Sequence, residues 1–152
     1  MSRVELDKTF TYNLGGTVSF GDLSENVVED LFKDGRIASH AIERQIEIWF
    51  PDLTFVNKKG YDHIDSSGRK YDAKNFTKAS GMNFMPSIMK GGGRSYDEEI
   101  AHGHAKEMIY IPCDIVDFPI VRVVFKKGSD LLKEYPDCSI SMTPENREWL
   151  FG

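Results

Sequence analysis

The chain has 152 residues, of which 40% are hydrophobic and 28% charged, which is typical of one globular domain with an ordinary core. It lacks an apolar run of roughly 18 residues and a basic-then-apolar start, so we expect neither a membrane span nor a secretory signal. Its two cysteines, Cys113 and Cys138, are too few for a disulfide scaffold or a thiolate zinc site, and they indicate reduced thiols in a cytoplasmic protein.

The first elements expected are a hairpin and two helices. Residues 8–20 alternate around a pair of glycines, a pattern that predicts a hairpin. The sequence DLSE at residues 22–25 resembles a capping box, and it predicts a short helix running to about Lys33. Apolar residues at helical spacing then predict a helix over residues 36–50, which Pro51 ends.

Three short strands should follow, over residues 53–57, 60–65 and 70–77, with a turn at residues 66–68 joining the last two. Residues 79–95 are rich in glycine and contain a proline, so we expect a long, mobile loop.

The last third of the chain predicts a helix over residues 96–108 and two strands over residues 109–115 and 120–125. Thr143-Pro144 fits a cap followed by a first-turn proline, so a terminal helix should cover residues 144–151. This order predicts a mixed α/β (α+β) fold, a single compact domain with a central β-sheet flanked by helices.

The net charge of −5 is unevenly distributed along the chain. Residues 56–94 carry 8 basic and 3 acidic side chains, whereas residues 1–55 and 95–152 each have a net charge of −5. One basic segment between two acidic flanks is either a solvated surface loop or a surface for a polyanion such as nucleic acid.

The basic segment also contains a pair of acids at a defined spacing. If the hairpin turns around residues 67 and 68, Asp62 lies opposite Asp72 or Ala73, and Asp72 and Lys74 project from one face of their strand. Two carboxylates that close repel each other unless a cation lies between them, and oxygen ligands favour magnesium over zinc. An ammonium group beside such an ion can position an attacking water.

An acid, a short spacer and Asp/Glu-x-Lys on a hairpin after a helix resemble the signature of the PD-(D/E)xK nuclease superfamily. The sequences Gly-x-Asp, Asp-x-x-Gly and Tyr-Asp-x-Lys within residues 60–75 are most similar to the PvuII-type restriction endonucleases. This close match covers about a tenth of the chain. The departures are the absence of proline before Asp62 and an aspartate at position 72, where glutamate is commoner.

The resemblance implies a Type II restriction endonuclease that hydrolyses double-stranded DNA with magnesium, which manganese can replace. Asp62 and Asp72 would ligate the metal together with the Ala73 carbonyl, and Lys74 would activate the water. A glutamate from the preceding helix would assist, with Glu43 as the best match and Glu47 as the alternative.

The resemblance also implies an organisation for the whole chain. Residues 1–152 would form one nuclease domain with a restriction-endonuclease-like core over residues 36–126. Residues 1–35 are a candidate dimerisation segment, because a palindromic target calls for a homodimer. The loop over residues 79–95 is a candidate for DNA recognition.

Two neighbouring side chains have competing interpretations. Asp65 competes with Asp62 as the first acid, but its place near the turn favours an ion pair or a turn role. His63 should point away from Asp62, and its role is either structural or DNA-facing.

Cations and amides around the proposed site are suited to phosphate contacts or base edges. The candidate DNA-contacting residues are Lys58, Lys59, Arg69, Lys70, Lys78, Asn83, Lys90 and Arg94, with Ser87 as a further base-reading candidate.

Other functions have weaker support. His102 and His104, near Glu98 and Glu99, form a poor zinc site because residues two apart on a helix face away from each other. The alternatives to a restriction enzyme are a junction-resolving or repair nuclease, which would recognise DNA shape, and a non-catalytic DNA-binding accessory protein with a nuclease-like fold.

Overall fold

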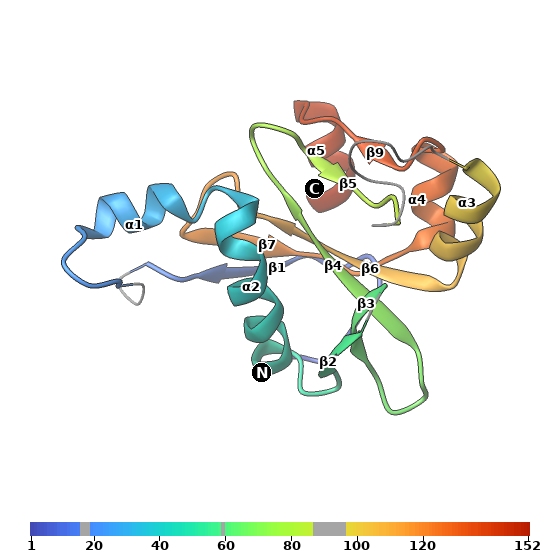
Figure 1. Ribbon diagram of the computed structural model, residues 1–152, viewed down its shortest axis with the longest axis horizontal. Helices are drawn as coiled ribbons and strands as arrows, with labels where there is room; N and C mark the ends of the chain where they lie inside the picture. The colour runs from blue at the N-terminus through green and yellow to red at the C-terminus, as the bar shows by residue number, and fades with distance from the viewer. Residues whose placement is uncertain (16–18, 59, 87–96) are drawn as a thin grey trace.

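The computed structural model describes residues 1–15, 19–58, 60–86 and 97–152 (Figure 1). Its helices are α1 (Glu25–Leu31), α2 (Gly35–Trp49), α3 (Glu98–Lys106), α4 (Gly128–Glu134) and α5 (Pro144–Phe151). Its strands are β1 (Phe10–Asn13), β2 (Thr54–Lys58), β3 (Tyr61–Ile64), β4 (Lys70–Phe76), β5 (Met82–Asn83), β6 (Met108–Asp114), β7 (Ile120–Val123), β8 (Lys126–Lys127) and β9 (Ser139–Ile140).

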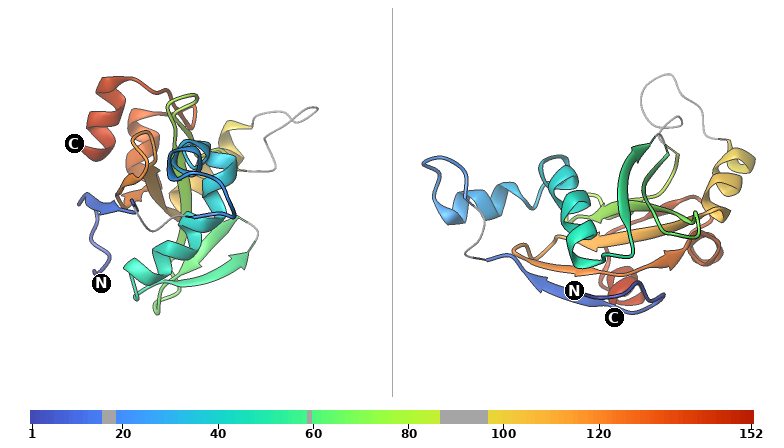
Figure 2. Two further views of the ribbon diagram at one scale, coloured as in Figure 1. Left: turned by 90° about the vertical axis from the view of Figure 1, so that its left-hand side faces the viewer. Right: turned by 90° about the horizontal axis from the view of Figure 1, so that it is seen from below.

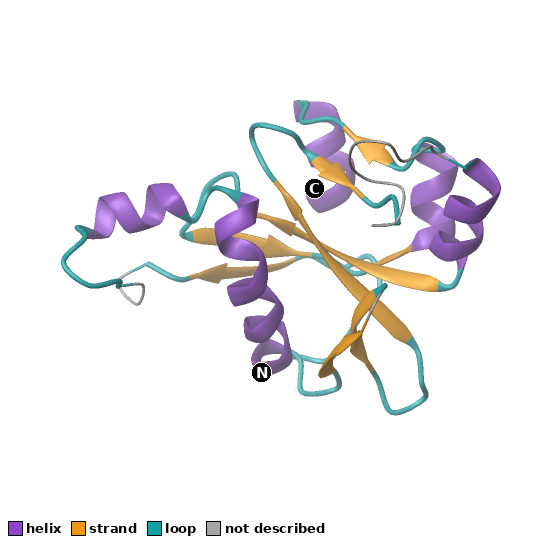
Figure 3. Cartoon of the chain, viewed as in Figure 1, coloured by secondary structure: helices purple, strands orange, loops and turns teal. Residues whose placement is uncertain are grey.

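The strands form one curled mixed sheet and a small separate ribbon. The sheet has the order β1-β7-β6-β4-β3-β2, with β8 also paired to β6, and β5 pairs with β9 in the ribbon. Within the sheet β4 and β6 run parallel, and the other pairs are antiparallel. A parallel pair needs a crossover connection, and α3 lies in that connection. The chain is therefore a single compact α+β domain (Figure 3).

The two faces of the sheet pack against two different cores, because successive residues of a strand point to opposite faces. On β6, Ile111 belongs to one core and Tyr110 to the other. Helix α2 covers the first core, into which it buries Ile42 and Ile46. Helices α3, α4 and α5 and the ribbon β5–β9 cover the second core.

Most of the expected elements are confirmed. Helix α2 begins at Gly35, where the Asp34 side chain accepts a hydrogen bond from the Arg36 amide, and it ends before Pro51. The three strands after it lie as predicted, and α5 covers Pro144–Phe151 with Thr143 as its cap. Helix α1 is also present, capped by Ser24.

The hairpin expected over residues 8–20 is wrong. Strand β1 pairs with β7, with Phe10 opposite Val123, and residues 19 and 20 form no strand. Local alternation predicted a strand correctly, but it could not identify a partner 113 positions away.

The loop expected over residues 79–95 is also wrong in part, because Met82 and Asn83 form β5 and pair with β9. Residues 87–95 of that prediction lie outside the described residues. The sequence analysis did not identify helix α4 or strands β8 and β9.

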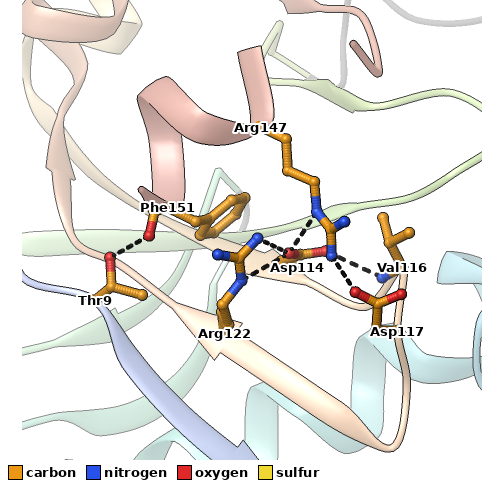
Figure 4. Close-up of polar contacts among 7 residues, drawn as sticks. All are labelled: Thr9, Asp114, Val116, Asp117, Arg122, Arg147 and Phe151. Carbon is orange, nitrogen blue, oxygen red and sulfur yellow. Dashed lines mark hydrogen bonds and ion pairs between the residues drawn. The ribbon is translucent and has the colours of Figure 1, made fainter. Parts of the chain in front are cut away.

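A buried aspartate fastens the C-terminal helix to the sheet (Figure 4). Asp114, only 1% exposed, accepts hydrogen bonds from Arg122, Arg147 and the amide of Val116. Arg147 lies on α5 and Arg122 on β7, so one carboxylate joins two elements to the end of β6. An ionised group is tolerated in the protein interior only when it is paired in this way, and removal of one partner is strongly destabilising.

Helix α1 lies at one end of the long axis of the molecule and α3 at the other (Figures 1 and 2). Four large apolar side chains of α1 and the segment before it are 43% or more exposed: Phe20, Leu23, Val27 and Leu31. Among the described residues, no helix combines the length and the apolar composition needed to cross a membrane.

Candidate active site

The hairpin of β3 and β4 has the predicted register, with His63 opposite Tyr71 and Ile64 opposite Lys70. Its turn is built by Asp65, whose carboxylate accepts hydrogen bonds from the amides of Ser67 and Arg69 and from the Tyr71 hydroxyl. These donors lower the pKa of Asp65, although burial opposes them. The turn role predicted for Asp65 is therefore confirmed.

Asp62 and Asp72 lie together one position beyond the last paired residues of the hairpin. The Asp62 carboxylate accepts a hydrogen bond of 3.0 Å from the Ala73 amide, next in the chain to Asp72. Asp72 is 8% exposed, and its carboxylate lies 3.1 Å from the Lys74 ammonium. The structure thus brings together three side chains that the sequence analysis assigned to one site.

The electrostatics of this group are those of two acids that share a confined space. The pKa of Asp62 is raised to about 8, chiefly by burial and in addition by a hydrogen bond with Asp72 and by the charges of Asp72 and Glu43. The Ala73 amide opposes the shift but does not cancel it. At neutral pH a proton or a cation must therefore compensate for the second negative charge.

Glu43 approaches the two aspartates from α2. Its side chain is 16% exposed, and its carboxylate lies 3.6 Å from His40. Burial raises the pKa of Glu43; the nearby charge of Asp72 adds to this, and those of His40 and Lys74 oppose it. Glu47, the alternative, instead pairs with Arg44 at 2.7 Å.

His63 has a structural position, because it is fully buried and faces α2. Its Nε2 lies 2.8 Å from the backbone carbonyl oxygen of Glu43, and its Nδ1 has no hydrogen-bond partner among the described residues. Burial lowers the pKa of His63, so the ring is neutral and Nε2–H donates to the Glu43 carbonyl. This bond ties the hairpin to the helix at the residue that faces the acids.

The carboxylates of Asp62 and Asp72 could hold a hard cation, although they are only part of a complete set of ligands. No group of three or more histidine, cysteine, aspartate or glutamate side chains within residues 1–15, 19–58, 60–86 and 97–152 is arranged to hold a metal ion. Magnesium commonly binds through one or two carboxylates and keeps several waters, so Asp62 and Asp72 are the described residues that could hold such an ion.

Several of the candidate DNA-contacting residues surround the group. Lys58, Arg69 and Lys78 are exposed, and Lys70 is half-buried, with its ammonium 5.2 Å from the centre of the Tyr61 ring. Asn83 is exposed, but its side-chain oxygen accepts a hydrogen bond from the Met85 amide. Lys59, Ser87, Lys90 and Arg94 lie outside the described residues.

A groove of about 1150 Å³ borders the site, and Lys74 and Lys78 both line it. The first turn of α2, the end of β4 and the ribbon β5–β9 form its walls. Its other cations are Lys33 and Arg36, and Asn75, Thr77, Ser80 and Asn83 supply polar groups. Asp34, which also lines the groove, is paired with Arg36 at 2.8 Å. The groove was not foreseen, because its walls come from four separate segments of the chain.

His104 also lies near the group, although its sequence pattern suggested at most a poor zinc ligand. The charges of Asp72 and Lys74 act on the pKa of His104, whereas His102 points elsewhere, with its Nε2 2.8 Å from the Pro136 carbonyl oxygen. The sequence feature that could have indicated this position is the apolar pair Ala101 and Ala105, because these residues mark the side of α3 that faces the sheet.

Comparison of the chain with protein-family models, with curated proteins and with solved structures found no match.

Proposed function

We propose that the protein is a magnesium-dependent endonuclease that hydrolyses phosphodiester bonds of double-stranded DNA. The observation that carries this proposal is the grouping of Asp62, Asp72 and Lys74, of which Lys74 also lines a groove with basic side chains. The resemblance to the PD-(D/E)xK nucleases rests on the same three residues. A helix followed by three antiparallel strands, a crossover helix and a parallel strand supports it further.

Each side chain has a defined task in this proposal. Asp62 and Asp72 would hold magnesium, with the Ala73 carbonyl as a third ligand, and the bound ion would supply positive charge to the phosphate. Lys74, held by Asp72 at 3.1 Å, would position the attacking water. The water oxygen forms the new bond to phosphorus while the bond from phosphorus to the 3′ oxygen breaks, which leaves a 5′-phosphate and a 3′-hydroxyl.

Glu43 would assist by holding the water. Burial already raises its pKa, so its carboxyl group is a better proton acceptor than an exposed glutamate. The bond from His63 to the Glu43 carbonyl would keep this residue in place.

The groove supports a polyanionic substrate. The groove is lined by four cations, Lys33, Arg36, Lys74 and Lys78, and by three acids, Asp30, Asp34 and Asp117. Asp34 pairs with Arg36 and Asp117 with Arg147, so a DNA backbone could follow the lysines away from the reacting phosphate. Such contacts supply affinity that falls as salt rises.

A Type II restriction enzyme acting on a palindrome would be a homodimer. The exposed apolar side chains of α1 and the segment before it support this region as the dimerisation segment, because a stripe of large apolar residues on a projecting helix lacks a partner within the described part of the chain.

The test is digestion of unmethylated phage DNA with magnesium by the wild type, by Lys74→Ala and by Lys133→Ala. Lys133 is an exposed lysine of α4, so its substitution removes the same charge away from the site. We expect discrete bands from the wild type and Lys133→Ala, none without metal, and at least a 100-fold loss with Lys74→Ala.

Two other outcomes would replace the proposal. Cleavage of four-way junctions with linear DNA left intact would indicate a junction-resolving enzyme. Binding of DNA without cleavage in magnesium or manganese would indicate an accessory DNA-binding protein.

A further inference from the structure

The side chain of His104 lies on the same side of the sheet as Asp72 and Lys74. The side chains of residues 72, 74 and 76 of β4 point to one face of the sheet. On that face Phe76 packs in the same core as Ala101 and Ala105 of α3. His104 follows Ala101 by three positions, which places it on the adjoining stripe of α3. Glu43 and His104 thus approach the site from helices on opposite faces of the sheet.

The ring of His104 rests on the backbone just before β3. A Cβ atom at Gly60 would lie 3.4 Å from Cε1 of His104, and Gly60 has φ +91°, a conformation that glycine adopts without strain. Gly60 stands two residues before Asp62, so the imidazole lies over the start of the strand that carries the first acid.

The imidazole of His104 is half-buried, yet it makes no hydrogen bond or ion pair with any described residue. Every other described histidine has a polar neighbour: His40 lies beside Glu43, His63 bonds the Glu43 carbonyl, and His102 bonds the Pro136 carbonyl. No described residue occupies the hydrogen-bonding positions of the His104 ring, so they are open to a ligand or to water.

The charges that act on His104 come from two parts of the chain: Asp72, Lys74 and Lys70 on β4, and Glu107 directly after α3. Their effects on the ring oppose one another, and burial lowers its pKa overall. At neutral pH the ring therefore has one N–H donor and one acceptor nitrogen. One neutral imidazole would contribute little to magnesium binding, because magnesium prefers oxygen ligands. The ring N–H of His104 is instead well suited to donate a hydrogen bond to a phosphate oxygen.

We propose that His104 is a further substrate-contacting residue, whose ring N–H donates a hydrogen bond to an oxygen of the DNA phosphate at the Asp62–Asp72–Lys74 group. This inference rests on the proposed nuclease function. Lys74 is already engaged by Asp72, so a second donor on the α3 side would fix the orientation of the phosphate for in-line attack.

The experiment compares His104→Gln, which keeps an N–H donor, with His104→Leu, which has similar size and no donor. His102→Gln and His102→Leu are the matched controls on the same helix. Single-turnover cleavage in magnesium should fall about 10- to 100-fold in His104→Leu, should stay within about fivefold of the wild type in His104→Gln, and should not change in the His102 variants.

A second readout does not depend on cleavage. In metal-free wild-type protein with ¹⁵N-labelled histidine, addition of a short DNA duplex should shift the ring resonances of His104 and leave those of His102 in place. Equal urea midpoints for His104→Leu and the wild type would show that the variant is folded.

Each result decides the matter. Wild-type rates in His104→Leu, or equal losses in the Leu and Gln variants, would overturn the role of His104 while leaving the nuclease intact. If the wild type cleaves no DNA, the proposed function fails, and the ring resonances then decide separately. A shift on DNA addition would support a phosphate contact, and the absence of a shift would overturn it.

Discussion

Replacing one acid of the candidate active site should stabilise the metal-free protein. In Asp62→Asn the amide can still accept the hydrogen bond from the Ala73 amide, but the second negative charge beside Asp72 is absent. We expect this gain in the free energy of unfolding to grow with pH, because the cost in the wild type comes from ionisation.

The magnitude follows from the pKa of Asp62, which is raised from 3.8 to about 8. Below about pH 4 both the folded and the unfolded states are protonated, so the shift has no effect. Between about pH 4 and 8 the unfolded chain releases this proton and the folded chain keeps it, so stability falls as pH rises. A pKa shift of about four units corresponds to about 5 kcal/mol in the free energy of unfolding. Partial contact with solvent and sharing of the proton with Asp72 reduce the expected gain in Asp62→Asn to about 2 kcal/mol at pH 8.

The assay is urea unfolding of the wild type and the variant in a chelator at pH 5 and pH 8. Asp65→Asn is the matched control on the same hairpin: it should destabilise by about 1–2 kcal/mol equally at both pH values, because Asp65 has a lowered pKa and is ionised throughout this range. A loss of stability in Asp62→Asn, or a gain independent of pH, would refute the reasoning. Magnesium should stabilise the wild type and leave Asp62→Asn nearly unchanged.

Three further changes test other parts of the structure. Asp114→Asn should cost about 3 kcal/mol in urea unfolding because two arginines lose a buried partner, whereas Asp117→Asn, at the exposed rim, should cost less than about 1 kcal/mol. Gly128→Ala should cost about 1–3 kcal/mol because its Cβ would overlap the Ala105 carbonyl oxygen, whereas Gly103→Ala has open space and should raise the melting temperature slightly. Val27→Asp should leave the circular dichroism spectrum unchanged and shift a dimer to monomer in sedimentation experiments, and an unchanged sedimentation coefficient would exclude α1 from the interface.

The sequence predicted those parts of the fold that local chemistry determines. Helix α2 follows from its apolar spacing and from Pro51, and the register of the hairpin follows from the tight turn at residues 66–68. The meeting of Asp62 with Asp72 was predictable because a tight turn fixes which residues lie opposite each other.

The missed features depend on contacts between distant segments. The partner of β1 lies beyond residue 119, and the ribbon joins residues 82–83 to residues 139–140. The position of His104 relative to Asp72 depends on the packing of α3 against β6 and α4, which a single sequence does not encode in any local pattern.

The pairing of β1 with β7 also has a consequence for synthesis on the ribosome. Phe10 cannot pair until Val123 has been synthesised, and at about 5–20 residues per second the 113 positions between them take roughly 6 to 23 seconds to be made. During that interval β1 has no partner strand, and the amino-terminal segment stays available to chaperones. Because β1 is expected to join late, substitutions in it should mainly accelerate unfolding and leave the folding rate almost unaltered.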